Sequence, residues 1–444
     1  MAFSHPLPVS CNLFSALAAV LDPRSAPRLV LLLVGAVLAR GRRTVTAWIR
    51  AAGLSHDYRS CYTTVAAAGK KTDLVAARLA RQVVRPLVAA APRLVLALDD
   101  TPTPRYGPHV QGAGIHHNPT PGPTGSAFLY GHLWVVLAAL VPHPLWGVAA
   151  LPLLARLYVR RIDLGGIERP HRPAFRTKLE LAADLMRWAK NWLGLHGQPL
   201  WVVADGAYAK KPFLGAMRTL GVTVVSRLRK DAALCDVPPP RRPGQRGRPR
   251  RYGESRLDLA KRAGQRRGWT TGTFELYGET ATKRYKTFRA TWRPAGGPIR
   301  VVLVDEPRGW RAYFATDPTA SVADVLGVVA DRFSLEIAFR EVKEVVGAGQ
   351  QQTRFHGANV GAFHVCLWTF TATEGWAWHR DGDRLTAHRE QSPWDKEPRR
   401  PSHADKRRAW TREILGDEIR AALRDGADEG EIHAIAERLL DLAA

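Results

Sequence analysis

Three acidic residues, Asp99, Asp205 and Glu336, have the types and settings that metal-dependent phosphoryl transfer requires. Each Asp directly follows a short apolar run typical of a strand buried on both faces, and Glu336 lies in a segment with helical spacing. Two-metal cleavage of phosphodiesters needs several anionic oxygen ligands around ions about 3.5–4 Å apart. Because clustered carboxylates repel one another without a cation, we predict a metal site at these three residues.

Two cations accompany the third acid on the same predicted helix. Arg332 lies four residues before Glu336 and Lys343 lies seven residues after it, so all three share one helix face. A metal ligand flanked by cations that bind phosphate is typical of chemistry on a DNA strand. The alternative is an ordinary Arg332–Glu336 pair one turn apart, which contributes a few tenths of a kcal/mol.

The first two acids also have a simpler interpretation, because an Asp after a strand commonly caps a turn. Asp99 is followed by Asp100. Successive strand residues face opposite ways, so we expect only one of these two to point into the site.

The composition favours a globular protein that binds a polyanion. Among 444 residues, 65 Lys and Arg against 40 Asp and Glu give a net charge of +25, which attracts nucleic acid, although an Arg-rich coding bias would give the same excess. Hydrophobic residues make up 45%, which excludes a wholly disordered chain. The early apolar run Leu29–Ala39 is shorter than the roughly 20 residues that a membrane helix needs, so we expect no membrane partner. The four cysteines are far apart and form no zinc or redox motif.

Changes of hydrophobic period divide the chain into five predicted segments, with an α/β fold in which a mixed sheet is flanked by helices. They are a helical N-terminal region with DNA binding as one interpretation (1–90), the first part of the catalytic domain (91–228), a basic β-rich insertion (229–320), the second part with the Glu336 helix (321–380), and a linker with C-terminal helices (381–444).

The predicted insertion contains the densest basic stretch. Arg241–Arg267 holds eleven Lys and Arg against two acids, and we expect Arg246, Arg248 and Arg250 to bind DNA. Arg246-Gly247-Arg248-Pro249 matches the core of an AT-hook, in which an extended Arg-Gly-Arg segment enters a narrow minor groove. A loop that binds phosphates is the alternative interpretation.

The motifs around the three acids resemble those of the DDE transposases of bacterial insertion sequences. They are Leu98-Asp99-Asp100-Thr101, Val203-Ala204-Asp205-Gly206-Ala207-Tyr208, and the segment Asp331–Lys343. The third has the Arg, Glu and Lys of the Tyr-x2-Arg-x3-Glu-x6-Lys signature of that family, while Val329 stands at the Tyr position. The resemblance covers roughly residues 90–375.

This resemblance implies a fold and a set of roles. The catalytic domain would be RNase H-like, interrupted by a β-rich insertion before the Glu. Asp99, Asp205 and Glu336 would bind two Mg²⁺ ions, for which Mn²⁺ substitutes, and Arg332 and Lys343 would hold DNA phosphates. Asp99 is chosen over Asp100 because the family pattern is an apolar residue, Asp, any residue, then Thr.

The function that the resemblance implies is transposition: cleavage of double-stranded DNA at the ends of an insertion sequence, then strand transfer into target DNA. We expect self-association into a dimer on DNA, in the bacterial cytoplasm with the nucleoid. The alternatives are a metal-dependent DNA nuclease without strand transfer and an inactive relative that only binds DNA. All three acids are present, which argues against the inactive relative.

Overall fold

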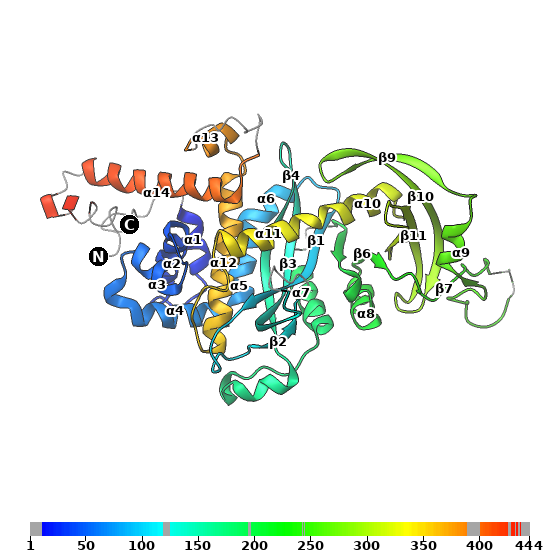
Figure 1. Ribbon diagram of the computed structural model, residues 1–444, viewed down its shortest axis with the longest axis horizontal. Helices are drawn as coiled ribbons and strands as arrows, with labels where there is room; N and C mark the ends of the chain where they lie inside the picture. Colours follow the sequence, from blue (N-terminus) through cyan, green and yellow to red (C-terminus); the bar gives the residue numbers. More distant parts are fainter. Residues whose placement is uncertain are drawn as a thin grey trace.

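The computed structural model describes residues 11–118, 125–193, 197–241, 243, 245–388, 400–424, 428–430, 432, 433 and 436. A mixed sheet of twelve strands runs through the molecule, with a helical bundle at one end and long antiparallel strands at the other (Figure 1). The mixed α/β class predicted from the sequence is therefore confirmed. No helix within these residues is both long and apolar enough to cross a bilayer.

The centre of the sheet combines antiparallel and parallel strands. Its strands are β1 (Leu94–Pro104), β3 (Phe128–His143), β4 (Gly147–Tyr158), β5 (Leu200–Ala204) and β6 (Thr223–Leu228), with the short β2 (Gly114–His117) paired to β3. The spatial order is β4, β3, β1, β5, β6. β3 is antiparallel to β1 and β4, whereas β1, β5 and β6 are parallel to one another.

β5 coincides with its apolar run, but β1 extends beyond its own. The sequence places Asp99 at the end of a strand, whereas β1 continues to Pro104. The reason is the antiparallel partner: β3 pairs with β1 from Val95 as far as Pro104, so its hydrogen bonds hold the polar residues in the strand as well. Asp99 therefore lies inside β1, while Asp205 directly follows β5.

The segment that the sequence analysis treats as an insertion is rich in strands. It contains β7 (Leu234–Cys235), β8 (Arg256–Leu257), α9 (Leu259–Gly264), β9 (Thr270–Leu276), β10 (Glu279–Trp292), β11 (Gly297–Asp305) and β12 (Arg311–Ala315). It does not form a separate sheet, because β12 pairs with β6 from Ala312–Leu228 to Ala315–Val225. The sequence does not predict this β6–β12 pairing, which joins the strands of the β-rich segment to the strands near the acids.

Helices cover the sheet and place the third acid. They are α7 (Lys178–Trp192), α8 (Lys211–Leu220), α10 (Val322–Asp331), α11 (Phe333–Glu344) and α12 (His356–Ala377). α12 is buried around most of its circumference, as its continuous apolar composition predicts. It packs between the sheet and the N-terminal helices; the Phe363 ring stacks on Trp134 of β3 at a centroid distance of 4.0 Å.

The N-terminal segment is a helical bundle. Its helices are α1 (Asn12–Ala18), α2 (Ala26–Leu38), α3 (Val45–Ala51), α4 (Tyr58–Lys70), α5 (Thr72–Leu79) and α6 (Arg85–Val88). Short 3-10 segments lie at Ser55–Asp57, Arg161–Gly166, Arg169–His171 and Gly206–Tyr208, and a π-helical segment at Ala80–Val84 joins α5 to α6. Thr44 caps α3, since its Oγ1 accepts a hydrogen bond from the Ala47 amide at 3.1 Å. α4 lies against α12 so closely that a Cβ on Gly69 would be 2.0 Å from the Gly357 carbonyl oxygen.

The C-terminal region contains α13 (Gly382–Thr386) and α14 (His403–Arg424). The sequence predicts a linker over 381–407 and helices from Arg412, but α14 begins at His403 because its first turns carry side chains that pack on α12. The linker residues 389–399 and most of the predicted helix after 424 lie outside the described residues.

Candidate functional site

One guanidinium joins the first and third predicted acids. Arg332 Nη1 lies 2.6 Å from Asp99 Oδ2, and Arg332 Nη2 lies 2.7 Å from Glu336 Oε1. Asp99 comes from the middle of β1 and Glu336 from the first turn of α11, 237 positions later in the numbering. The fold therefore brings two carboxylates that are far apart in the sequence to a single cation.

The break between α10 and α11 places this cation. α10 ends at Asp331 and α11 begins at Phe333, so Arg332 stands at the junction, one turn before Glu336. Leu335, Ala338 and Val342 are buried on the inner face of α11, which turns Glu336 outward. This packing leaves the Asp99 and Glu336 carboxylates accessible to a cation from solvent, since their side chains are 19% and 45% exposed.

Asp205 lies near Asp99, directly after the neighbouring strand β5. The β1–β5 register ends at Leu98–Ala204, so Asp99 and Asp205 are the next pair on these parallel strands. Asp205 is exposed, and its Oδ2 accepts a hydrogen bond from the Ala207 amide at 3.1 Å. Among the described residues no group of three or more His, Cys, Asp and Glu is arranged to hold a metal ion. The structure thus brings Asp99 and Glu336 together and keeps Asp205 adjacent to Asp99 without closing a three-ligand group.

The neighbouring acid, Asp100, faces the other side of the sheet. Its Oδ2 accepts from Lys178 Nζ at 2.5 Å at the start of α7, and its Oδ1 accepts from the Tyr208 hydroxyl at 3.3 Å. Asp99 and Asp100 alternate as strand geometry requires, and it is Asp99 that faces Glu336. Tyr208 stands in the second quoted motif, but no sequence signal links Lys178 to Asp100, because the contact depends on how α7 packs.

The electrostatics of the pair depend on its burial. Burial raises the pKa of Asp99 from 3.8 to about 6, although the Arg332 guanidinium acts in the opposite direction, and the nearby charges of Asp100 and Asp205 raise it further. Burial and the Asp100 charge also raise the pKa of the Tyr208 hydroxyl. An additional positive charge near Asp99 would therefore stabilise the ionised form of its carboxyl group.

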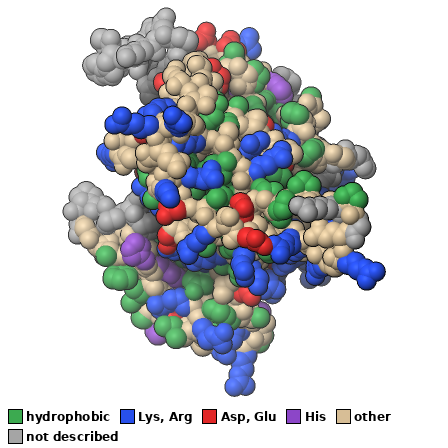
Figure 2. All heavy atoms as spheres, turned by 90° about the vertical axis from the view of Figure 1, so that its right-hand side faces the viewer, with side chains coloured by type: hydrophobic (Ala, Val, Ile, Leu, Met, Phe, Trp, Pro, Cys, Tyr) green, Lys and Arg blue, Asp and Glu red, His purple; other side chains and the backbone are tan. Residues whose placement is uncertain are grey.

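The remaining predicted DNA contacts do not reach these acids. Lys343 lies two turns along α11, where burial lowers its pKa, and no described contact joins it to the acids. Arg246, Arg248 and Arg250 are exposed in the loop between β7 and β8, at the right-hand end of Figure 1, and Arg250 pairs with Glu254. Figure 2 shows Lys and Arg side chains spread over this end of the molecule, with a smaller group of acids between them.

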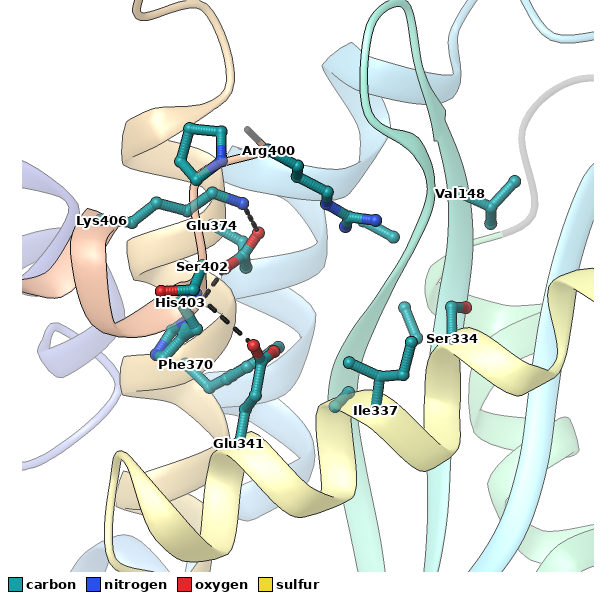
Figure 3. A pocket seen from close by; sticks show the side chains of 14 residues that line it. Val148, Ser334, Ile337, Glu341, Phe370, Glu374, Arg400, Ser402, His403 and Lys406 are labelled. Carbon is teal, nitrogen blue, oxygen red and sulfur yellow. Dashed lines mark hydrogen bonds and ion pairs between the residues drawn. The ribbon is translucent and has the colours of Figure 1, made fainter. Parts of the chain in front are cut away.

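A pocket lies beside α11 but away from the acids (Figure 3). Its volume is about 240 Å³, and α11 contributes Ser334, Ile337 and Glu341 to its wall. The buried Glu374 of α12 receives hydrogen bonds from Lys406 Nζ at 2.5 Å and, across the Oε1–Nδ1 contact of 2.8 Å, from His403. Since this charge network is internally paired, its evident role is to fasten α14 to α12.

Comparison with protein families matches residues 16–297 to the family described as DDE superfamily endonuclease. The match covers more than half of the chain and includes Asp99 and Asp205, whereas α11 with Glu336 follows it. A search of curated proteins found no match.

Proposed function

The chain belongs to the DDE superfamily endonuclease family, and we propose that it is a transposase that cuts the ends of an insertion sequence and joins them to target DNA. The supporting observation is the convergence of Asp99 and Glu336 on one cation, with Asp205 directly after the adjacent strand. This convergence connects the matched part of the chain to the α11 helix that follows it.

The donor set suits a divalent metal. Asp99 and Glu336 supply anionic oxygens, the ligands that Mg²⁺ and Mn²⁺ prefer, and the position between them already attracts the positive charge of Arg332. Asp205 would complete the ligands for two ions. Such ions activate the attacking oxygen and stabilise the leaving oxygen of a phosphodiester. In this proposal Arg332 leaves the carboxylates when metal enters and, with Lys343, binds the phosphates near the cut.

The substrate of this proposed reaction is double-stranded DNA at both steps. The exposed Arg246, Arg248 and Arg250 would hold DNA at a distance from the acids, and the net charge of +25 favours it throughout. Two copies would assemble on the paired ends, on nucleoid DNA in the bacterial cytoplasm.

The proposal is tested with DNA that carries the flanks of the gene for this protein. In Mg²⁺ or Mn²⁺, wild-type protein is expected to cut at defined flank positions and to join the released 3′ ends to a target plasmid. Cutting without joined products would indicate a nuclease, and binding without cutting would indicate an inactive relative.

Removing Arg332 is expected to strengthen the response to metal. In Arg332→Gln the carboxylates lose their internal cation, so the metal-free protein should lose about 1–3 kcal/mol of unfolding free energy. Because metal no longer competes with a guanidinium, the rise in melting temperature on adding Mn²⁺ should exceed that of wild type. Differential scanning fluorimetry with and without Mn²⁺ measures both effects.

Arg340→Gln is the matched control, since Arg340 is exposed on α11 and its described contacts include no ion pair. It should respond to Mn²⁺ as wild type does. A response in Arg332→Gln that is equal to or smaller than that of wild type would contradict the proposed exchange of Arg332 for metal.

Neutralising the basic loop is expected to weaken DNA binding in a salt-dependent way. If Arg248 contacts one phosphate, the negative slope of log K against log salt should become smaller in magnitude by about 0.9 in Arg248→Ala. Fluorescence anisotropy over a salt series measures this slope. Arg308→Ala, an exposed arginine between β11 and β12, serves as the control; equal slopes for Arg248→Ala and wild type would remove the loop from the interface.

A further inference from the structure

Four arginines meet where the N-terminal bundle contacts α14. Arg40 and Arg43 lie in the loop between α2 and α3, and Arg407 and Arg408 lie in the second turn of α14. Arg407 is only 8% exposed, and its Nη2 donates a hydrogen bond to the Ala39 carbonyl. Arg40 and Arg408 are exposed, so the group, here called the arginine cluster, has a buried floor and an open rim.

The arginine cluster carries charge that the described chain does not neutralise. Within the described residues none of its four guanidinium groups forms an ion pair with a carboxylate, and the buried Nε atoms of Arg43 and Arg407 have no hydrogen-bond partner. Burial, followed by the charges of Arg43, Arg40 and Arg408, lowers the pKa of Arg407 to about 9. Buried charges are ordinarily paired, because an unpaired one loses its hydration without compensation. An anion at this position would restore the balance.

The arginine cluster is linked to the helix that carries Glu336. The Arg43 amide donates to Gln350 Oε1 at 2.7 Å, and Gln351 Nε2 donates to the Arg43 carbonyl at 2.8 Å. These glutamines follow α11 in the chain, and α11 runs toward the N-terminal bundle (Figure 1). From Glu336 to Glu344 the helix rises about 12 Å. This rise is shorter than the roughly 34 Å of one turn of B-DNA, and the arginine cluster adjoins the segment that follows α11.

We infer that the arginine cluster is a binding site for the backbone phosphates of DNA, and that it holds the duplex whose strand enters at Asp99 and Glu336. The inference rests on the proposed function. Guanidinium groups bind phosphate oxygens through paired hydrogen bonds, and the exposed Arg40 and Arg408 present such groups at the rim. A DNA duplex carries a row of phosphates along its backbone. Such a row can supply negative charge to the exposed rim and to the buried floor of the arginine cluster at the same time.

The test removes the rim and leaves the floor intact. Arg40→Ala combined with Arg408→Ala takes away two exposed charges without disturbing the core. Arg187→Ala combined with Lys190→Ala takes away two exposed charges from α7, on the face of the sheet opposite α11. Binding to a duplex that carries the gene flank is measured by anisotropy in Ca²⁺ over a salt series, and cleavage is measured separately in Mg²⁺.

In the rim variant the negative slope of log K against log salt is expected to become smaller in magnitude by about 2, since each lost phosphate contact contributes about 0.9. The α7 variant should retain the wild-type slope. An unchanged slope in the rim variant, or an equal decrease in both variants, would overturn the inference even if the wild type cleaves DNA. If wild type binds and only the rim variant loses slope, but no DNA is cleaved, the phosphate site stands and the proposed activity fails.

Discussion

The Glu336→Gln variant is expected to lose DNA cleavage by about 10³-fold while its affinity for DNA stays close to that of wild type. The amide keeps the size of the side chain but removes the charge that would attract metal. A metal ion contributes several kcal/mol to stabilising the charge of a phosphoryl transition state, and about 4 kcal/mol corresponds to 10³-fold in rate. Binding should persist because Glu336 is itself negative and repels phosphate.

The measurement pairs single-turnover cleavage with anisotropy on the same duplex. Glu344→Gln is the matched control, because Glu344 is an exposed acid on the same helix, two turns after Glu336. It should cleave at the wild-type rate. Asp99→Asn and Asp205→Asn should fall with Glu336→Gln if the three carboxylates act together. Cleavage by Glu336→Gln within tenfold of wild type would show that this residue does not hold the metal.

The distance along the chain decides how much of this site is predictable. The Arg332–Glu336 contact follows from their spacing of four residues on a helix, and the structure contains it. Strand alternation predicts that Asp99 and Asp100 face opposite sides of the sheet. It does not predict that α11 lies on the Asp99 side and α7 on the Asp100 side, because this depends on how the helices pack. The bridge from Arg332 to Asp99 depends on packing between segments more than two hundred residues apart, which no local pattern encodes.

The same limit applies to the sheet. The apolar run of β5 begins directly after Pro199 and ends directly before Asp205, and these are the observed ends of the strand. The extension of β1 to Pro104 is not, because hydrogen bonds from β3 overcome the weak strand preference of its polar and proline residues. The β6–β12 pairing joins segments on either side of the basic region, so the sequence indicates strands there but not their partners.

Breaking the buried charge network of Glu374 is expected to produce the largest loss of stability. Glu374 and Lys406 side chains are 6% and 3% exposed. Glu374→Gln leaves the Lys406 ammonium buried without its counter-charge, and loss of one partner of a buried pair costs about 3–5 kcal/mol. Urea unfolding at pH 7 measures the loss, and hydrogen exchange of α14 locates it. Glu413→Gln, which breaks the more exposed pair between Glu413 of α14 and Arg380, should cost less than about 1 kcal/mol.

The pH dependence of this loss follows from the pKa of Glu374. Burial alone would raise that pKa, but the Lys406 charge and the His403 hydrogen bond lower it from 4.5 to about 2. A carboxyl group with a lowered pKa in the folded state stabilises the protein fully above its unfolded pKa, and this contribution disappears as the pH falls through the folded pKa. The stability difference between wild type and Glu374→Gln should therefore be constant at neutral pH and shrink from about pH 4.5 downward. If the stability difference between wild type and Glu374→Gln stays constant down to pH 3, Glu374 stabilises α14 by packing and not by charge. The same conclusion would follow if Glu374→Gln costs as much stability in a Lys406→Met background as it does in wild type.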